Sequence, residues 1–130
     1  MTRPRSALTA RALVSLPAPP AIVHLSADFF GVAPEVLGDR SLLCGVLVSA
    51  AGAAGLQTSG APLVLQHPDG AVSAILPSDG CHMSLHTMPA REVAILDVLA
   101  RPGHDVQRAL DVVARRIAAR SVRAERRERG

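Results

Sequence analysis

Four side chains that can act as nucleophiles or proton carriers lie within a short stretch of this sequence: Ser73, Cys81, His82 and His86. A thiol, imidazoles and a hydroxyl are the components of an activated nucleophile, in which a neighbouring base takes the proton. Gly80 precedes Cys81, and a residue without a side chain lets backbone strain accumulate there. The alternative is structural, with Cys81 as a small buried residue and the histidines as ordinary strand residues.

The spacing of apolar residues predicts the elements that must position these side chains. Apolar residues alternate with polar ones in some segments, as in a strand, and recur every three to four residues in others, as in a helix. This order predicts an α+β fold: a two-layer sandwich of an antiparallel β-sheet with two helices packed on one face. The predicted strands cover residues 22–30, 62–67, 71–76, 82–88 and 92–99, and the predicted helices cover residues 41–54, with Ser41 as N-cap, and 105–120.

Two of these strands are expected to form a hairpin that gathers the reactive residues. The stretch from His67 to Gly70, HPDG, is a turn signal between two apolar runs. On the strand over 82–88, His82 and His86 share one face. Because Ser73 lies on the preceding strand with matching parity, we expect Cys81, Ser73 and His86 to converge in one pocket.

The distribution of charge separates a central domain from two basic ends. All 14 basic residues are arginine, and the formal net charge is +3. Residues 28–100 sum to −5, whereas residues 101–130 sum to +5. We therefore predict a disordered leader over residues 1–20, one domain over 21–120 and an Arg-rich disordered tail over 121–130. A basic tail also suits a nucleic-acid-binding arm, but a solvated extension is the preferred interpretation.

The composition excludes several classes of protein and of site. Two cysteines make neither a disulfide framework nor a zinc set, so no metal is expected. No apolar run is long enough to span a membrane, and Pro17, Pro19 and Pro20 would break the helix of a signal peptide, which predicts a cytoplasmic protein. Aromatic residues make up only 2%, which argues against stacking platforms for single-stranded nucleic acid. Because the chain has no lysine, imine chemistry would need a carbonyl from elsewhere.

Several segments resemble the short bacterial and archaeal S-adenosylmethionine decarboxylases. That family has a proenzyme motif of the form E-S-H-x-[SA]-[IV]-H-T-W-P-E, and residues 80–90 read GCHMSLHTMPA. HLSADFFG at 24–31 is similar to the first strand of the family, and HPDGAVS at 67–73 to its F-S-P-Q-G-V-S segment. Ser73 stands eight residues before Cys81, which is the family spacing between a processing serine and the cleavage site. The resemblance covers roughly residues 22–118.

The resemblance implies a pyruvoyl cofactor made from the chain itself. Self-cleavage between Gly80 and Cys81 would turn Cys81 into the pyruvoyl group that forms a Schiff base with the substrate. Ser73 would assist processing, His86 would donate a proton to it, and His82 would be a further catalytic candidate. The implied activity is decarboxylation of S-adenosylmethionine or another amino acid in polyamine (spermidine) biosynthesis, by a homodimer with its sites near the subunit interface.

The departures from the family pattern fall at functional positions. The family's later cysteine proton donor aligns with Arg101, so His24 or His82 would have to replace it. Its aromatic clamp on adenine is reduced to weak contacts from Met88 and Phe29. Two hypotheses follow: a diverged pyruvoyl-dependent decarboxylase, or an unprocessed, non-catalytic paralogue that acts as partner or regulator of an intact decarboxylase. The substitutions are Gly80 for Glu, Cys81 for Ser, Met88 for Trp, Ala90 for Glu and Gln66 for Phe.

Overall fold

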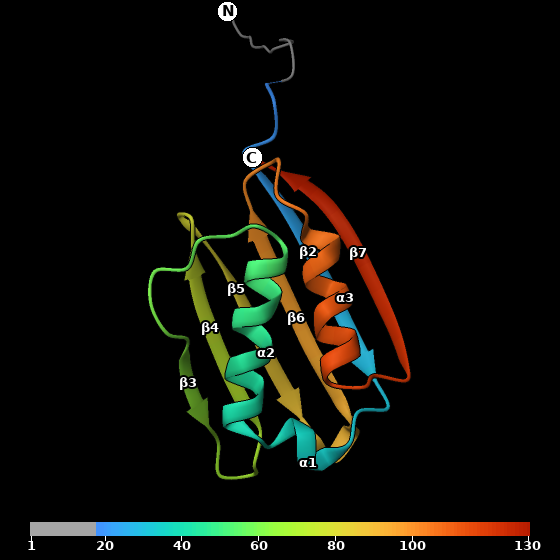
Figure 1. Cartoon of the computed structure of the whole chain (residues 1–130). Helices are drawn as coiled ribbons and strands as arrows, with labels where there is room; N and C mark the ends of the chain where they lie inside the picture. The colour runs from blue at the N-terminus through green and yellow to red at the C-terminus, as the bar shows by residue number, and fades with distance from the viewer. Residues whose placement is uncertain (1–17) are drawn as a thin grey trace, which may run out of the picture.

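The structure is a computed structural model that describes residues 18–130 (Figure 1). The predicted strands and helices are present in the predicted order, with one further strand at the C-terminal end. Part of the predicted leader, residues 1–17, lies outside the described residues. The elements are β2 (Ile22–Phe30), α1 (Pro34–Leu37), α2 (Arg40–Ala53), β3 (Leu63–Gln66), β4 (Val72–Ser78), β5 (Cys81–Met88), η1 (Pro89–Arg91), β6 (Val93–Ala100), α3 (Val106–Arg116) and β7 (Ser121–Arg129).

The six strands form one antiparallel sheet in the order β3-β4-β5-β6-β2-β7. Helices α2 and α3 lie side by side on one face of it, which confirms the α+β sandwich (Figure 1). Alternate strand residues point under these helices and form the core, among them Phe29, Met83 and Leu96. The residues between them point to the opposite face, which no helix of the described chain covers. We call this the open face.

Helix α2 begins one residue earlier than predicted because a different residue caps it. The Leu42 amide donates a hydrogen bond of 3.1 Å to the Asp39 carboxylate, so Asp39 is the N-cap and Ser41 lies in the first turn. Along the helix Leu43, Val46 and Leu47 are fully buried, as their spacing predicts.

The prediction of a disordered tail over residues 121–130 is wrong. Helix α3 ends at Arg116 rather than near 120, because Ala118 adopts a left-handed φ of 54° and turns the chain back. The Arg120 amide then donates to the Phe30 carbonyl at 2.9 Å, and β7 pairs with β2 along its whole length. Because the ladder is made by backbone groups, a strand of exposed, charged side chains can form at the sheet edge.

The helices of residues 18–130 are all too short or too polar to span a membrane.

Candidate functional site

Strands β4 and β5 bring Ser73 and His86 together on the open face. The two residues are direct partners in the antiparallel register, and their side chains point away from the helices. Ser73 Oγ lies 2.8 Å from His86 Nδ1, within hydrogen-bond distance. His82 and Ser84 share this face, as predicted, whereas Met83, Leu85 and Thr87 are buried beneath it. The expected meeting of Ser73 and His86 on one face of the sheet is therefore confirmed.

A second imidazole, His67, completes this group. Its Nε2 lies 2.9 Å from Ser73 Oγ, and its ring meets the His86 ring edge-on with centroids 6.0 Å apart. Sequence reasoning assigned His67 only to the hairpin turn. The sequence does contain a signal for this position. His67 lies two residues after Leu65, and Leu65 pairs with Ser73. Because side chains alternate along a strand, His67 points to the same face as Leu65 and Ser73.

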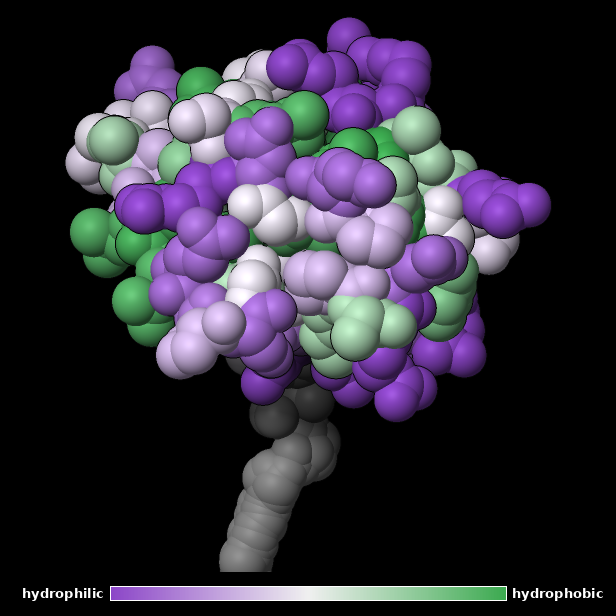
Figure 2. Space-filling view, turned by 90° about the horizontal axis from the view of Figure 1, so that it is seen from below, coloured by the Kyte–Doolittle hydropathy of each residue, from purple (hydrophilic) through white to green (hydrophobic). Residues whose placement is uncertain are grey.

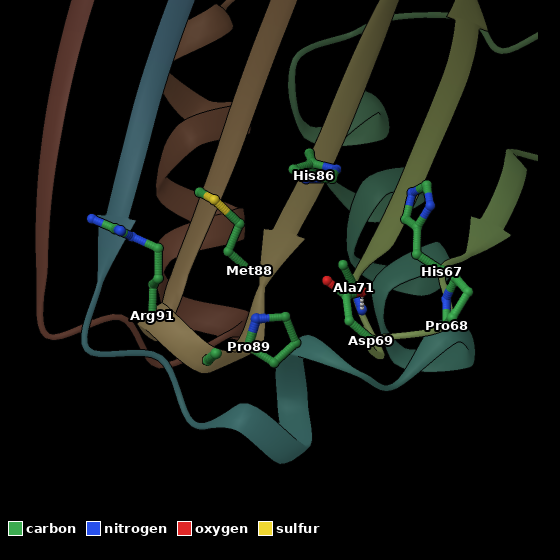
Figure 3. Close-up of a pocket in the computed structure, with 9 residues that line it drawn as sticks. His67, Pro68, Asp69, Ala71, His86, Met88, Pro89 and Arg91 are labelled. Carbon is green, nitrogen blue, oxygen red and sulfur yellow. Dashed lines mark hydrogen bonds between the residues drawn. The ribbon is translucent and has the colours of Figure 1, made fainter.

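A pocket of about 600 Å³ opens beside the two imidazoles. Figure 3 shows His67, Asp69 and Ala71 on one side of it and Met88 and Arg91 on the other. The remaining lining residues are Pro68, His86, Pro89 and Ala90. Met88 thus lines this pocket, and the lining has charges of both signs but no phenylalanine, tyrosine or tryptophan.

Cys81 lies at the opposite end of the hairpin from this pocket. It is the first residue of β5 and pairs with Ser78, and strand alternation places its half-buried side chain toward the helix-covered face. Five residues of extended strand separate Cys81 from His86, which corresponds to roughly 16 Å. The expectation that Cys81 joins Ser73 and His86 in one pocket is therefore wrong within a single chain.

Gly80 occupies a two-residue turn, and Arg101 lies against it. Asp79 and Gly80 both have left-handed φ values, of 50° and 76°, as in a type I′ hairpin turn. Arg101 Nη2 lies only 2.7 Å from the point where a Cβ at residue 80 would be. Arg101, which aligns with the family's proton-donating cysteine, therefore lies beside the Gly80–Cys81 peptide bond. His104 approaches the same turn, with Nε2 3.7 Å from Asp79 Oδ2.

The other candidates lie apart from the pocket. Phe29 is fully buried under the helices, so its expected contact with a substrate on the open face is wrong. Its neighbour Phe30 faces the open side and carries the Arg123 guanidinium 5.3 Å from its ring centre. His82 is exposed on the open face near the turn. His24 lies 2.9 Å from Asp97 on the neighbouring strand, which ties its imidazole to that carboxylate.

The fold and this hydrogen-bonded group define an α+β sandwich protein with a cluster of two histidines and a serine on the open face of its sheet. Residues 23–130 match the model of the family described as S-adenosylmethionine decarboxylase. The chain therefore belongs to the S-adenosylmethionine decarboxylase family, as the sequence resemblance implied.

A solved structure supports the same fold. The crystal structure of the adenosylmethionine decarboxylase from Aquifex aeolicus superposes with a TM-score of 0.76 at 24% sequence identity. The alignment covers 87% of this chain and 93% of that one, so the similarity spans nearly the whole sandwich. No curated protein sequence matches this chain.

Proposed function

We propose that this protein is a pyruvoyl-dependent decarboxylase that cuts its own chain between Gly80 and Cys81. The observation that carries the proposal is the hydrogen bond between Ser73 and His86, at the spacing from Cys81 that the family resemblance implies. The residues present also suit the formation of the cofactor. Cys81 supplies both a nucleophile and a leaving group, and Gly80 places no side chain on the attacked carbonyl.

Each step of the proposed processing uses groups of this chain. The Cys81 thiol loses its proton and its sulfur attacks the Gly80 carbonyl carbon, and the C–N bond then breaks to give a thioester and a free amine. Removal of the Cys81 α-proton breaks the S–Cβ bond, leaving a thiocarboxylate on Gly80 and dehydroalanine at residue 81. Water then replaces the nitrogen, which leaves as ammonia. The resulting pyruvoyl ketone supplies an electron sink for decarboxylation of an amine-bearing substrate.

The separation along β5 favours a site that is shared between two copies of the chain. His86 does not reach the Gly80 carbonyl of its own chain across roughly 16 Å. A homodimer with hairpins running in opposite directions would place Ser73 and His86 of one copy beside Cys81 of the other. The open face also exposes Leu63, Leu65 and Ile75, by 68%, 61% and 45%. Figure 2 shows hydrophobic side chains gathered on the β3 side of the molecule, which such a dimer would cover.

The pocket favours a small, charged substrate. Asp69 can attract the amine and Arg91 the carboxylate of an amino acid, while Met88 offers a soft apolar contact. S-adenosylmethionine carries these groups, and polyamine biosynthesis is the role that the family implies. Because the lining has no aromatic ring to stack on adenine, another amino acid with the same two groups is an equal candidate substrate.

The mass of the denatured protein tests the proposal. We expect two fragments, residues 1–80 and 81–130, the second without a free amino terminus and with a ketone that borohydride reduces. Cys81→Ala should abolish the cut because alanine has neither nucleophile nor leaving group, whereas Cys81→Ser, which restores the family residue, should retain it. A wild-type chain that stays intact at 13.5 kDa after long incubation at neutral pH would reject the proposal.

An unprocessed partner or regulator of an intact decarboxylase is the second candidate. It is favoured by the contact between Arg101 and Gly80, which fills the space beside the peptide that would be cut. Under this reading the chain stays intact and associates with a processed decarboxylase. Co-purification of the intact chain with such an enzyme, together with a change in that enzyme's activity, would support it over the first proposal.

A further inference from the structure

We propose that His67, Ser73 and His86 form a proton relay that leads from solvent at His67 to the pocket at His86. The two short contacts share one atom, Ser73 Oγ, at 2.9 Å from His67 Nε2 and 2.8 Å from His86 Nδ1. Both imidazoles line the pocket, whereas the hydroxyl joins them from behind. The hydrogen-bonded relay itself does not depend on the proposed function; only the use of the proton in the pocket rests on it.

The backbone around His67 holds its ring against Ser73. The His67 amide donates to the Ala71 carbonyl at 2.8 Å, and the Gly70 amide donates to the His67 carbonyl at 2.9 Å. Asp69 accepts from the Ala71 amide at 3.0 Å, which closes the turn from the inside. Because the turn is fixed by two backbone hydrogen bonds and one to the Asp69 carboxylate, the imidazole of His67 is presented to Ser73 rather than left free in solvent.

A hydroxyl has a single proton, and this couples the two rings. If Ser73 donates its proton to His86 Nδ1, His67 must donate its own Nε2 proton to Ser73. If Ser73 donates to His67 Nε2, His86 must donate from Nδ1. In both arrangements the neutral rings have the same tautomer, both protonated at Nε2 or both at Nδ1. The protonation of one ring therefore sets the hydrogen-bonding role of the other.

The relay moves one proton, and every group that gives up a proton receives another. His86 gives its Nε2 proton to an acceptor in the pocket and takes the Ser73 proton on Nδ1. Ser73 takes the Nε2 proton of His67, and His67 takes a proton from water on Nδ1. The net change is one proton moved from solvent to the pocket. This supplies the proton donor that the family places in a cysteine and that this chain replaces with Arg101, a poor acid.

Charged groups lie on the elements around the relay. Asp69 lies in the same turn as His67, and Arg91 faces both rings across the pocket. On the neighbouring strand β6, Ile95 lies opposite His86 and Asp97 stands two residues further on the same face. His67 acts through Ser73 rather than on a substrate, so it is a positioning residue.

Two-bond ¹H–¹⁵N spectra of the histidine rings test the relay directly. The full chain is used in a Cys81→Ala background, so that every sample is uncut whether or not the wild type processes itself. We expect His67 and His86 to show the same neutral tautomer, because both rings share the single proton of the Ser73 hydroxyl. His67→Phe keeps a ring of similar size and should change the tautomer populations of His86, because Ser73 then has only His86 as a ring partner.

Two further variants distinguish a relay from mere packing. Ser73→Ala should uncouple the rings, so that His67→Phe then leaves the His86 tautomer unchanged. His82→Gln is the matched control, because His82 lies on the same strand and face as His86 without touching the relay, and it should leave the His86 signals as they were. Different tautomers at His67 and His86, or a His86 tautomer that is the same with and without His67→Phe, would overturn the relay. Since no chain in this experiment is cut, these outcomes are independent of processing.

Discussion

At the scale of single residues, the tip of the β4–β5 hairpin is where the proposed cut would fall. Gly80 is the residue whose carbonyl the thiol would attack, and it is also the residue that lets the turn form. Its φ of 76° lies in the left-handed region, which residues with a Cβ adopt only at a cost. Arg101 uses the space that a side chain at residue 80 would fill. The glutamate that the family resemblance expects here would therefore require a rearranged Arg101.

Substituting this glycine should destabilise the fold. We expect Gly80→Ala to lower the free energy of unfolding by about 1–2 kcal/mol, from the left-handed φ together with the 2.7 Å approach of Arg101 Nη2. Gly45→Ala is the control, because Gly45 lies inside α2 with no atom within 4 Å of its would-be Cβ, and it should stabilise by about 0.5–1 kcal/mol. Urea denaturation measures both. Adding Arg101→Ala to Gly80→Ala should recover only the part of the loss that the contact causes.

At the scale of elements, strand β7 completes the sheet at the edge of β2. Nine pairs of residues align along the two strands, and the Arg123 guanidinium donates to Asp28 at 2.9 Å while it lies over Phe30. The many charged side chains of β7 protect its outer edge against pairing with other chains. The arginines therefore have a structural use as the border of the sheet.

Removing β7 should cost far more stability than removing its ion pair. A chain that ends at residue 120 leaves β2 as an unpaired edge strand. We therefore expect its free energy of unfolding to fall by on the order of 3 kcal/mol and the protein to aggregate. Arg123→Ala removes an exposed ion pair and the contact with the Phe30 ring, and should cost about 1–1.5 kcal/mol. Denaturant titration and light scattering measure the two effects. Equal stability of the truncated and full-length chains would contradict the role given to β7.

At the scale of the whole molecule, one sheet face is packed by helices and the other is not. The open face carries the Ser73–His86 group near one end of the β4–β5 hairpin, whereas Cys81 lies at the other end with its side chain toward the helix-covered face. A two-fold axis between two such faces would exchange these ends. The dimer proposed above is therefore the arrangement in which the separated parts of the site meet.

Complementation between two inactive variants tests that arrangement. The chain with His86→Ala keeps Cys81, and the chain with Cys81→Ala keeps Ser73 and His86. In co-expressed, mixed dimers we expect the His86→Ala chain to be cut, because its partner supplies the missing group. Ser73→Ala co-expressed with His86→Ala is the control and should give no such rescue. In that mixed dimer one site lacks the Ser73 hydroxyl and the other lacks the His86 imidazole. Mass spectrometry of the denatured mixture identifies which chain was cut, and absence of rescue by Cys81→Ala would place the whole site in one chain.

Local properties of the sequence determined most of the sandwich. The periods of apolar residues located five strands and two helices, because burial of one face requires that pattern wherever a core is packed. Family membership followed from short motifs around Cys81 and His86, and the contact of Ser73 with His86 followed from strand alternation within one hairpin.

Tertiary structure alone decided three features. Strand β7 has no apolar period because both of its faces are exposed, so only its pairing with β2 reveals it. The nearness of Arg101 to Gly80 depends on how β6 leaves the sheet next to a turn some twenty residues earlier in the chain. The meeting of His67 with Ser73, and the distance of Cys81 from both, depend on the register of β3, β4 and β5. A hydrogen-bond ladder between backbone groups sets that register, and the spacing of side chains along a single strand does not encode it.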